Sequence, residues 1–151
     1  MKPYILLFVF ALSSTVAAKA QTTEDSVKAA INKLFDAMKN SDSAMLITAF
    51  SDSAVLQTIV RSKNGTVRVL NEKVKEFGAS ITKYPKGALD ERISFGSIKI
   101  DDDLASVWTP YKFYFNNKFL HCGVNSFQLV RIKGEWKIQY LIDTRRIVPC
   151  E

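Results

Sequence analysis

Apolar residues recur at helical spacing near the start of the chain. Thr22 can cap a helix, and the acidic Glu24 and Asp25 suit its first turn. Apolar side chains then follow at intervals of three and four residues, namely Val27, Ala30, Ile31, Leu34, Phe35 and Met38. This pattern predicts one amphipathic helix that ends at the polar residues 40–42. A short second helix is expected over residues 43–48.

A third helix, capped by Asn71, is expected to stop at residues 84–87, which include a proline and a glycine. Most of the remaining chain favours strands. The strands are expected over residues 54–61, 66–70, 92–100, 104–115, 119–132 and 135–146. Turn signals separate them at Lys63-Asn64-Gly65, Asp101-Asp102-Asp103, Asn116-Asn117 and Lys133-Gly134. The order of elements predicts an α+β domain with helices packed on one face of an antiparallel sheet.

The first twenty residues are typical of a secretory signal peptide. Lys2 precedes an apolar run over residues 4–12 that is too short to span a bilayer, and Ala18-Lys19-Ala20 is a small-x-small cleavage site. We expect cleavage after Ala20, which leaves residues 21–151 as a single exported domain, periplasmic or secreted. An uncleaved anchor is the alternative reading of this segment. Elsewhere no apolar run is long enough to cross a membrane, so no stable membrane anchor is expected.

The charge of the mature chain is modest. The full sequence has 21 Lys and Arg against 15 Asp and Glu, and removal of Lys2 and Lys19 leaves 19 against 15, or +4. The lysines are scattered along the chain rather than clustered. We therefore expect a solvated basic surface and no nucleic-acid partner.

A recognisable motif lies in the closing hairpin. It reads Phe127-Gln128-Leu129-Val130-Arg131 and then Gly134-Glu135-Trp136-Lys137-Ile138. Together with the order of the helices, this motif resembles the nuclear transport factor 2-like superfamily over nearly the whole mature chain. The start at His121-Cys122-Gly123 and the end at Asp143-Thr144-Arg145-Arg146 resemble the exported bacterial branch labelled "putative lumazine-binding".

The resemblance implies a cone-shaped fold, in which a strongly curved antiparallel sheet wraps around a pocket that the N-terminal helices close. The superfamily includes ketosteroid isomerases, scytalone dehydratase and polyketide cyclases, together with non-catalytic binding and transport modules. In its catalytic members an acidic residue inside the cone acts as a base. The fold therefore implies a pocket and does not settle its chemistry.

The turn at Lys133-Gly134 sets the register of the closing hairpin. A two-residue turn places Ile132 opposite Glu135 and fixes the pairing further along both strands. The pairs on the core-facing side would be Arg131 with Trp136, Leu129 with Ile138, Phe127 with Tyr140, Asn125 with Ile142, Gly123 with Thr144 and His121 with Arg146. This side is apolar near the turn and polar at its far end, as expected for a pocket wall.

The same register turns Asp143 and Arg145 outward, where an ion pair would contribute about 0–1 kcal/mol. A bulge in the last strand would instead turn Asp143 inward. On the preceding strand, Tyr111 and Phe113 would complete the pocket wall. Pro110 interrupts that strand's hydrogen bonds and suits a bulge, which leaves Trp108 as an alternative lining residue.

The leading functional hypothesis is an exported protein that binds a small, partly apolar molecule. The expected ligand-binding residues are Trp108, Tyr111, Phe113, His121, Asn125, Tyr140 and Arg146. The alternative is an isomerase or a dehydratase that acts by proton transfer in the same pocket, with His121 and Asp143 as candidate catalytic residues. His121 is the only histidine, and its ordinary pKa of about 6.5 suits a proton shuttle.

No cofactor is expected, and no metal site, because one histidine and scattered carboxylates do not form the usual ligand sets. A homodimer is expected through the outer face of the sheet. The register assigns to that face Val124, Gln128, Gln139 and Leu141.

Cys122 and Cys150 are an even pair in a chain that we expect to be exported, which favours a disulfide. The register leaves Cys150 five residues, or roughly 17 Å of extended chain, beyond the residue opposite Cys122. A bridge needs Cα atoms about 5.5 Å apart, so the tail would have to turn back, as Pro149 permits. Two unpaired thiols remain the alternative.

Overall fold

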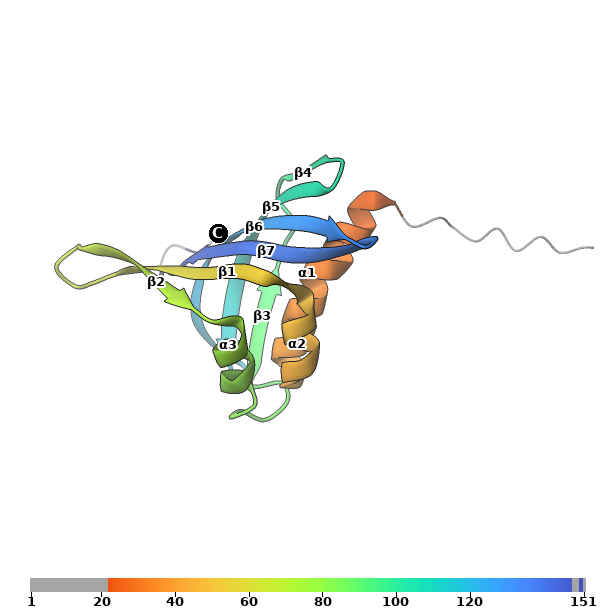
Figure 1. Ribbon diagram of the computed structural model, residues 1–151. Helices are drawn as coiled ribbons and strands as arrows, with labels where there is room; N and C mark the ends of the chain where they lie inside the picture. Colours follow the sequence, from red (N-terminus) through yellow and green to blue (C-terminus); the bar gives the residue numbers. More distant parts are fainter. Residues whose placement is uncertain (1–21, 148–149, 151) are drawn as a thin grey trace, which may run out of the picture.

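A computed structural model describes residues 22–147 and Cys150. The predicted signal peptide therefore lies outside the described residues. Figure 1 shows the domain from its first helix onward. The helices are α1 (Thr23–Asn40), α2 (Ser43–Ala49) and α3 (Val74–Ile81). The strands are β1 (Phe50–Arg61), β2 (Val67–Glu72), β3 (Leu89–Ile93), β4 (Ile98–Asp101), β5 (Leu104–Phe115), β6 (Lys118–Ile132) and β7 (Glu135–Thr144).

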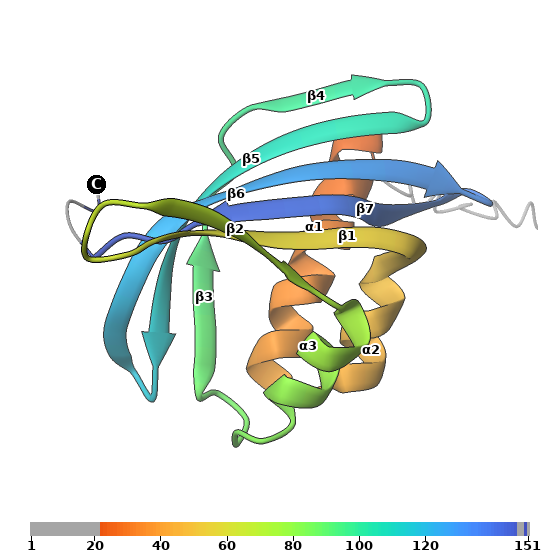
Figure 2. The same ribbon diagram turned by 60° about the vertical axis from the view of Figure 1, so that its left-hand side comes forward.

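All seven strands join one curved sheet in the order β2-β1-β7-β6-β5-β3, and β4 also pairs with β5. The three helices pack against one side of it, and Figure 2 shows the long strands passing over them. The predicted α+β class and curved sheet are confirmed. One detail is wrong, because β1 runs parallel to β7 and the sheet is therefore mixed rather than antiparallel throughout.

The N-terminal helix follows its sequence signals. Thr22 and Asp25 form a capping box, in which the Thr22 side chain accepts from the Asp25 backbone N–H and the Asp25 carboxylate accepts from the Thr22 N–H. The buried face of α1 packs on the concave face of the sheet. Phe35, for example, meets Phe127 edge to face with ring centroids 6.2 Å apart. The core contains Val27, Ile31, Leu34, Leu46, Ile81, Val107, Phe127, Leu129 and Ile138.

Two predicted turns form as two-residue connections with positive φ at both positions, Asn116-Asn117 and Lys133-Gly134. The loop after β1 consists of the predicted residues Lys63-Asn64-Gly65. The Ser62 backbone N–H donates to the Thr66 carbonyl oxygen across it, and only Gly65 in it has a positive φ.

Two element boundaries also differ from the prediction. Strand β2 continues through Asn71, so α3 begins later, after Lys73, without a side-chain cap. The strand expected over residues 92–100 is two strands, β3 and β4, both paired with β5. The chain between them runs close to β5 at Gly96, where an added Cβ would lie 2.9 Å from the Trp108 carbonyl oxygen.

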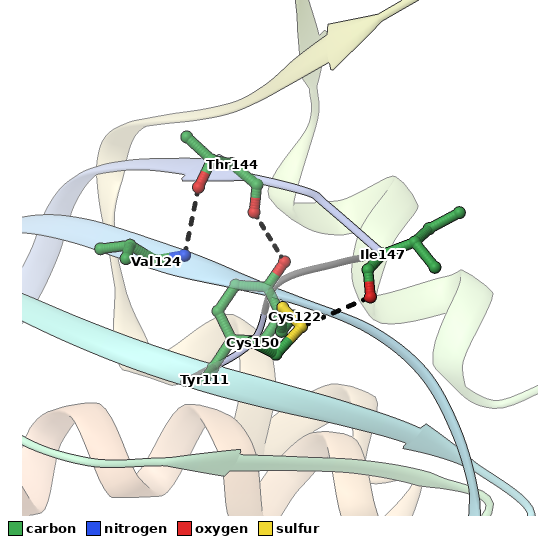
Figure 3. Close-up of a disulfide and its surroundings, with 6 residues drawn as sticks. All are labelled: Tyr111, Cys122, Val124, Thr144, Ile147 and Cys150. Carbon is green, nitrogen blue, oxygen red and sulfur yellow. Dashed lines mark hydrogen bonds between the residues drawn. A yellow bond between two sulfur atoms is a disulfide. The ribbon is translucent and has the colours of Figure 1, made fainter.

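Cys150 forms a disulfide with Cys122 of β6 (Figure 3). Their Cα atoms are 6.0 Å apart, within the range that a disulfide needs. Of the two alternatives for these cysteines, the structure has the disulfide. No helix within the described residues combines the length and the apolar character that crossing a membrane requires.

Candidate functional site

A cavity of about 270 Å³ lies between the concave face of the sheet and helices α1 and α3. Its apolar lining comes from both sides and comprises Leu34, Phe35, Met38, Leu56, Phe77, Ile81, Leu89, Phe113 and Leu141. Its polar lining comes mainly from the sheet and comprises Thr58, Glu72, Ser80, Tyr84, Glu91, Tyr111, Asn125, Asp143 and Arg145. Because Glu72 and Arg145 are partly exposed, the polar side reaches solvent.

One polar group of the cavity is the pair Glu91 and Asn125. The Asn125 side-chain amide donates to Glu91 Oε1 at 2.9 Å. Burial raises the pKa of Glu91 from 4.5 to about 7, although the Asn125 hydrogen bond acts in the opposite direction, and the nearby Asp143 carboxylate raises it further. Glu91 can therefore hold or release a proton near neutral pH.

The second polar group is centred on Asp143, which is buried. One carboxylate oxygen accepts from the Thr58 hydroxyl at 2.6 Å, and the other accepts from Arg145 Nε at 3.1 Å. The Tyr111 hydroxyl lies 3.2 Å from the same Asp143 oxygen and 2.9 Å from the Thr144 carbonyl oxygen. Burial and the Asp143 carboxylate raise the pKa of Tyr111, which therefore remains a donor. Both oxygens of Asp143 are thus already engaged by protein donors.

The inward position of Asp143 corrects the predicted register. Leu129 pairs with Ile138 as expected, but the next pair is Gln128 with Tyr140, which leaves Gln139 as an extra residue in β7. Beyond this bulge every residue of β7 is displaced by one position, so Asn125 faces Asp143 and not Ile142. The structure therefore has the bulged alternative.

Contacts from β1 hold the bulge. The Gln139 side-chain oxygen accepts from the hydroxyls of Ser51 at 2.7 Å and Ser53 at 3.3 Å, and its amide donates to the Ser53 carbonyl at 3.1 Å. The pairing of β1 with β7 is irregular at the same place, between Phe50 and Val55. The extra residue is thus accommodated by the neighbouring strand.

The cavity brings together some of the predicted residues. Tyr111, Phe113 and Asn125 line it, together with Asp143. His121 lies on the same face beside the rings of Tyr111 and Phe113, with ring centroids 5.7 and 4.9 Å away, but does not line the cavity. Burial, followed by the charge of Arg145, lowers the pKa of His121 below 6.5, so the imidazole is neutral at pH 7.

Three predicted wall residues lie elsewhere. Tyr140 falls on the opposite face because of the bulge, and its hydroxyl donates to Gln57 Oε1 at 2.7 Å. Arg146 pairs with Cys122 rather than with His121, and it also lies outside the cavity. Trp108 is 48% exposed on the outer face. The pairing of β5 with β6 also has a bulge, which lies between Phe113 and Tyr114 and not at Pro110. Regular alternation along β5 therefore points Tyr111 inward and Trp108 outward.

Sequence reasoning missed Glu91, because the strand predicted over residues 92–100 begins one residue after it, whereas β3 begins at Leu89. The signal was present in the alternation of Leu89, Glu91 and Ile93, which places one carboxyl group among inward apolar side chains. Arg145 was expected to face outward, and its inward position follows from the same bulge as that of Asp143.

Within residues 22–147 and Cys150, no group of three or more His, Cys, Asp or Glu side chains is arranged to hold a metal ion.

Comparison with models of known protein families shows to which family the chain belongs. The family model described as "Putative lumazine-binding" matches residues 22–140. The chain belongs to this family. A comparison with curated proteins gives no significant match.

Solved structures of nuclear transport factor 2-like proteins have the same fold as this chain. A superfamily protein of unknown function from Shewanella baltica has a TM-score of 0.64 at 14% identity, over 83% of this chain and 94% of that one. A cystatin-like-fold domain of unknown function from Nostoc punctiforme has a TM-score of 0.64 at 16% identity, covering 84% and 80%. A ketosteroid isomerase-like protein from Erwinia carotovora atroseptica has a TM-score of 0.59 at 16% identity, covering 82% and 95%. At these identities the likeness concerns the fold alone.

Proposed function

We propose that the protein binds a small, partly apolar molecule in the cavity between the sheet and helices α1 and α3. The observation that carries the proposal is a lining that combines apolar side chains from both sides with a polar wall, the group of polar side chains that comes mainly from the sheet. Such a cavity takes up the apolar part of a ligand through desolvation and orients its polar part through a few hydrogen bonds.

The polar wall favours a ligand that donates hydrogen bonds. Arg145 is already paired with Asp143, whereas Glu91 accepts one described hydrogen bond, from Asn125, and keeps acceptor capacity. Glu72 adds a further carboxyl group, whose pKa is raised by burial. A nitrogen heterocycle with N–H groups fits this wall, because Glu91 can accept from it while the Asn125 amide offers both a donor and an acceptor.

Isothermal titration calorimetry with lumazine and a set of N–H-bearing heterocycles tests the proposal. We expect Glu91→Gln to weaken binding of the best ligand at least tenfold, because a hydrogen bond to a charged group contributes about 1.5–3 kcal/mol. Glu135→Gln is the matched control, since Glu135 is exposed beside the β6–β7 turn. If no compound of the set binds, or if both variants weaken binding equally, the proposal fails.

A second candidate function is an isomerase or a dehydratase, and the pKa of about 7 at Glu91 favours it. A carboxylate near neutral pKa can remove a proton from carbon next to a carbonyl group and return it elsewhere on the same molecule. Asp143 is a weaker candidate for the base, because Thr58 and Arg145 engage its oxygens. Deuterium uptake from D₂O into β,γ-unsaturated ketones tests this function, and equal rates for wild type and Glu91→Gln would count against it.

We also propose that the chain is exported and that its first twenty residues are a cleaved signal peptide. Lys2, the apolar run over residues 4–12 and the Ala18-Lys19-Ala20 sequence support this, as does a disulfide, which persists in oxidising compartments. The test is the intact mass of protein isolated from the periplasm of a bacterial host. Loss of residues 1–20 is expected, and an uncleaved chain in the cytosol contradicts the proposal.

A homodimer through the outer face of the sheet remains part of the proposed function. Trp108 and Val55 are 48% and 44% exposed, and the half-buried Val124 and Tyr140 lie between them on the same face. Leu141 does not belong to this face, because the bulge turns it into the cavity. Light scattering should give the mass of two chains for wild type and of one chain for Trp108→Glu. A monomeric wild-type protein overturns the proposal.

A further inference from the structure

We propose that the face of the sheet opposite to the cavity carries a second binding site, specific for a small molecule in which an anionic group adjoins an apolar part. Its basis is a row of residues that are direct neighbours across three strands and the segment that follows β7. Arg92 of β3 pairs with Lys112 of β5, Lys112 pairs with Cys122 of β6, and Cys122 pairs with Arg146 beyond β7.

Strand alternation places this row away from the cavity. Lys112 lies between Tyr111 and Phe113, which line the cavity, and therefore points to the other side of the sheet. Arg92 follows Glu91, and Arg146 follows Arg145, in the same way. Three cationic side chains thus share one face at one end of the sheet, independently of the proposed function of the cavity.

The charge of this row is poorly balanced by the described residues. Arg92 is bound to Asp90 at 2.9 Å and lies over the Tyr114 ring at 4.0 Å from its centroid. Lys112 and Arg146 form no ion pair within residues 22–147. Like charges directly opposite each other on neighbouring strands destabilise a sheet, and a bound anion would remove that cost for Arg92 and Lys112.

The row borders a hollow of about 240 Å³. Its lining contains no acidic residue among those described, and it adds the hydroxyl-bearing Ser94 to the three cations. The Cys122–Cys150 disulfide fixes Cys150 as one wall of the hollow (Figure 3). A planar guanidinium and an ammonium group that converge on one hollow suit a phosphate or carboxylate group.

An adjoining hollow defines the second part of the ligand. It shares Lys112 and Cys150 with the first and is otherwise lined by Tyr114, Phe119 and Ile147. Ile147, at 71% exposure, offers an apolar surface to this hollow. The two hollows together accommodate an anionic group on the cationic side and an apolar or aromatic group on the other.

Phenyl phosphate is the probe for this site, and an amide ¹H–¹⁵N NMR titration of the mature, oxidised protein locates its binding. We expect saturable shifts centred on Lys112, Cys122 and Arg146, with weaker binding of inorganic phosphate. Lys112→Gln should weaken binding at least fivefold, and Lys112→Arg should largely restore it. Lys99→Gln is the control, because Lys99 is an exposed lysine on β4 away from the row. The NMR spectrum itself shows that each variant is folded.

Three outcomes overturn the proposal. They are an absence of saturable shifts, shifts centred on the cavity residues Glu91 and Asn125, and equal weakening by Lys112→Gln and Lys99→Gln. Phenyl phosphate that binds no more tightly than inorganic phosphate overturns the apolar part of the assignment. The double variant Cys122→Ser with Cys150→Ser should weaken binding severalfold, because Cys150 is then no longer fixed as a wall, and unchanged affinity contradicts that role.

Discussion

Asn125 lies directly opposite Asp143 across strands β6 and β7. This pairing joins the two polar groups of the cavity, since Asn125 binds Glu91 of β3 and Asp143 binds Thr58 of β1. The polar wall is therefore assembled from strands at both sides of the sheet. Four properties of this arrangement and of its surroundings can be measured.

The stability of the protein should depend on pH through Glu91. Because its pKa rises from 4.5 to about 7 on folding, the folded protein keeps a proton that the unfolded chain has released between these values. The contribution of Glu91 to the free energy of unfolding is complete below about pH 4.5. It declines as the pH rises to 7, by an amount on the order of 1–3 kcal/mol. Urea unfolding at pH 5 and pH 8 should show the decline in wild type and a smaller one in Glu91→Gln. Equal declines would show that other groups cause it.

Loss of the Asp143 carboxylate should destabilise the fold. Asp143→Asn removes the charge that Arg145 pairs with and weakens the bonds from Thr58 and Tyr111. Since the Arg145 side chain is about half exposed, we expect a loss of about 1–2 kcal/mol rather than the larger cost of a fully buried pair. Asp102→Asn, at an exposed ion pair with Arg131, should change stability by less than about 0.5 kcal/mol. Comparable urea midpoints for both variants would contradict the central role of Asp143.

The disulfide should contribute to stability through the unfolded chain. Cys122 and Cys150 are 28 residues apart in sequence, for which the chain-entropy model gives about 3.5 kcal/mol. Intact mass after alkylation should show no free thiol without reductant and two alkylated thiols with it. The double serine variant should unfold at lower urea concentration than wild type, and equal midpoints would show that the bridge adds no stability.

Gly123 should tolerate no side chain. A Cβ at this position would meet the backbone carbonyl oxygen of Thr144 and the Tyr111 ring on the cavity side of the sheet. Since the backbone cannot move without disturbing the pairing of β6 with the end of β7, Gly123→Ala should cost at least about 2 kcal/mol. Ser126→Ala, on the outer face of the same strand, is the control and should cost less than about 1 kcal/mol. A loss below about 0.5 kcal/mol for Gly123→Ala would exclude the close approach.

The sequence predicts the fold well where signals are local. The α1 stripe, its capping residues and the Lys133-Gly134 turn depend on neighbours in sequence, and each forms as expected. The parallel pairing of β1 with β7 joins segments about eighty residues apart and leaves no local trace, so the sheet was expected to be antiparallel. The motif of the closing hairpin indicated the cone-shaped fold, because it combines several positions with a known order of helices.

The residues of the site are harder to predict than the fold, because the face on which each one lies depends on the register of strand pairing. The bulge at Gln139 is held by Ser51 and Ser53 of another strand, and nothing in β6 or β7 alone requires it. One displaced residue was enough to move Asp143 into the cavity and Tyr140 out of it. Side chains before the bulge, such as Leu129 and Ile138, were paired correctly.

The bulge has a consequence for the composition of the cavity wall. If the bulge were lost with Gln139 retained, Gln139 would pair with Gln128, and the two faces of β7 would be exchanged from that point onward. Ile142 and Thr144 would then replace Asp143 and Arg145 in the cavity wall. Serines of β1 that bind Gln139 therefore help to decide, from a neighbouring strand, which side chains of β7 face the cavity.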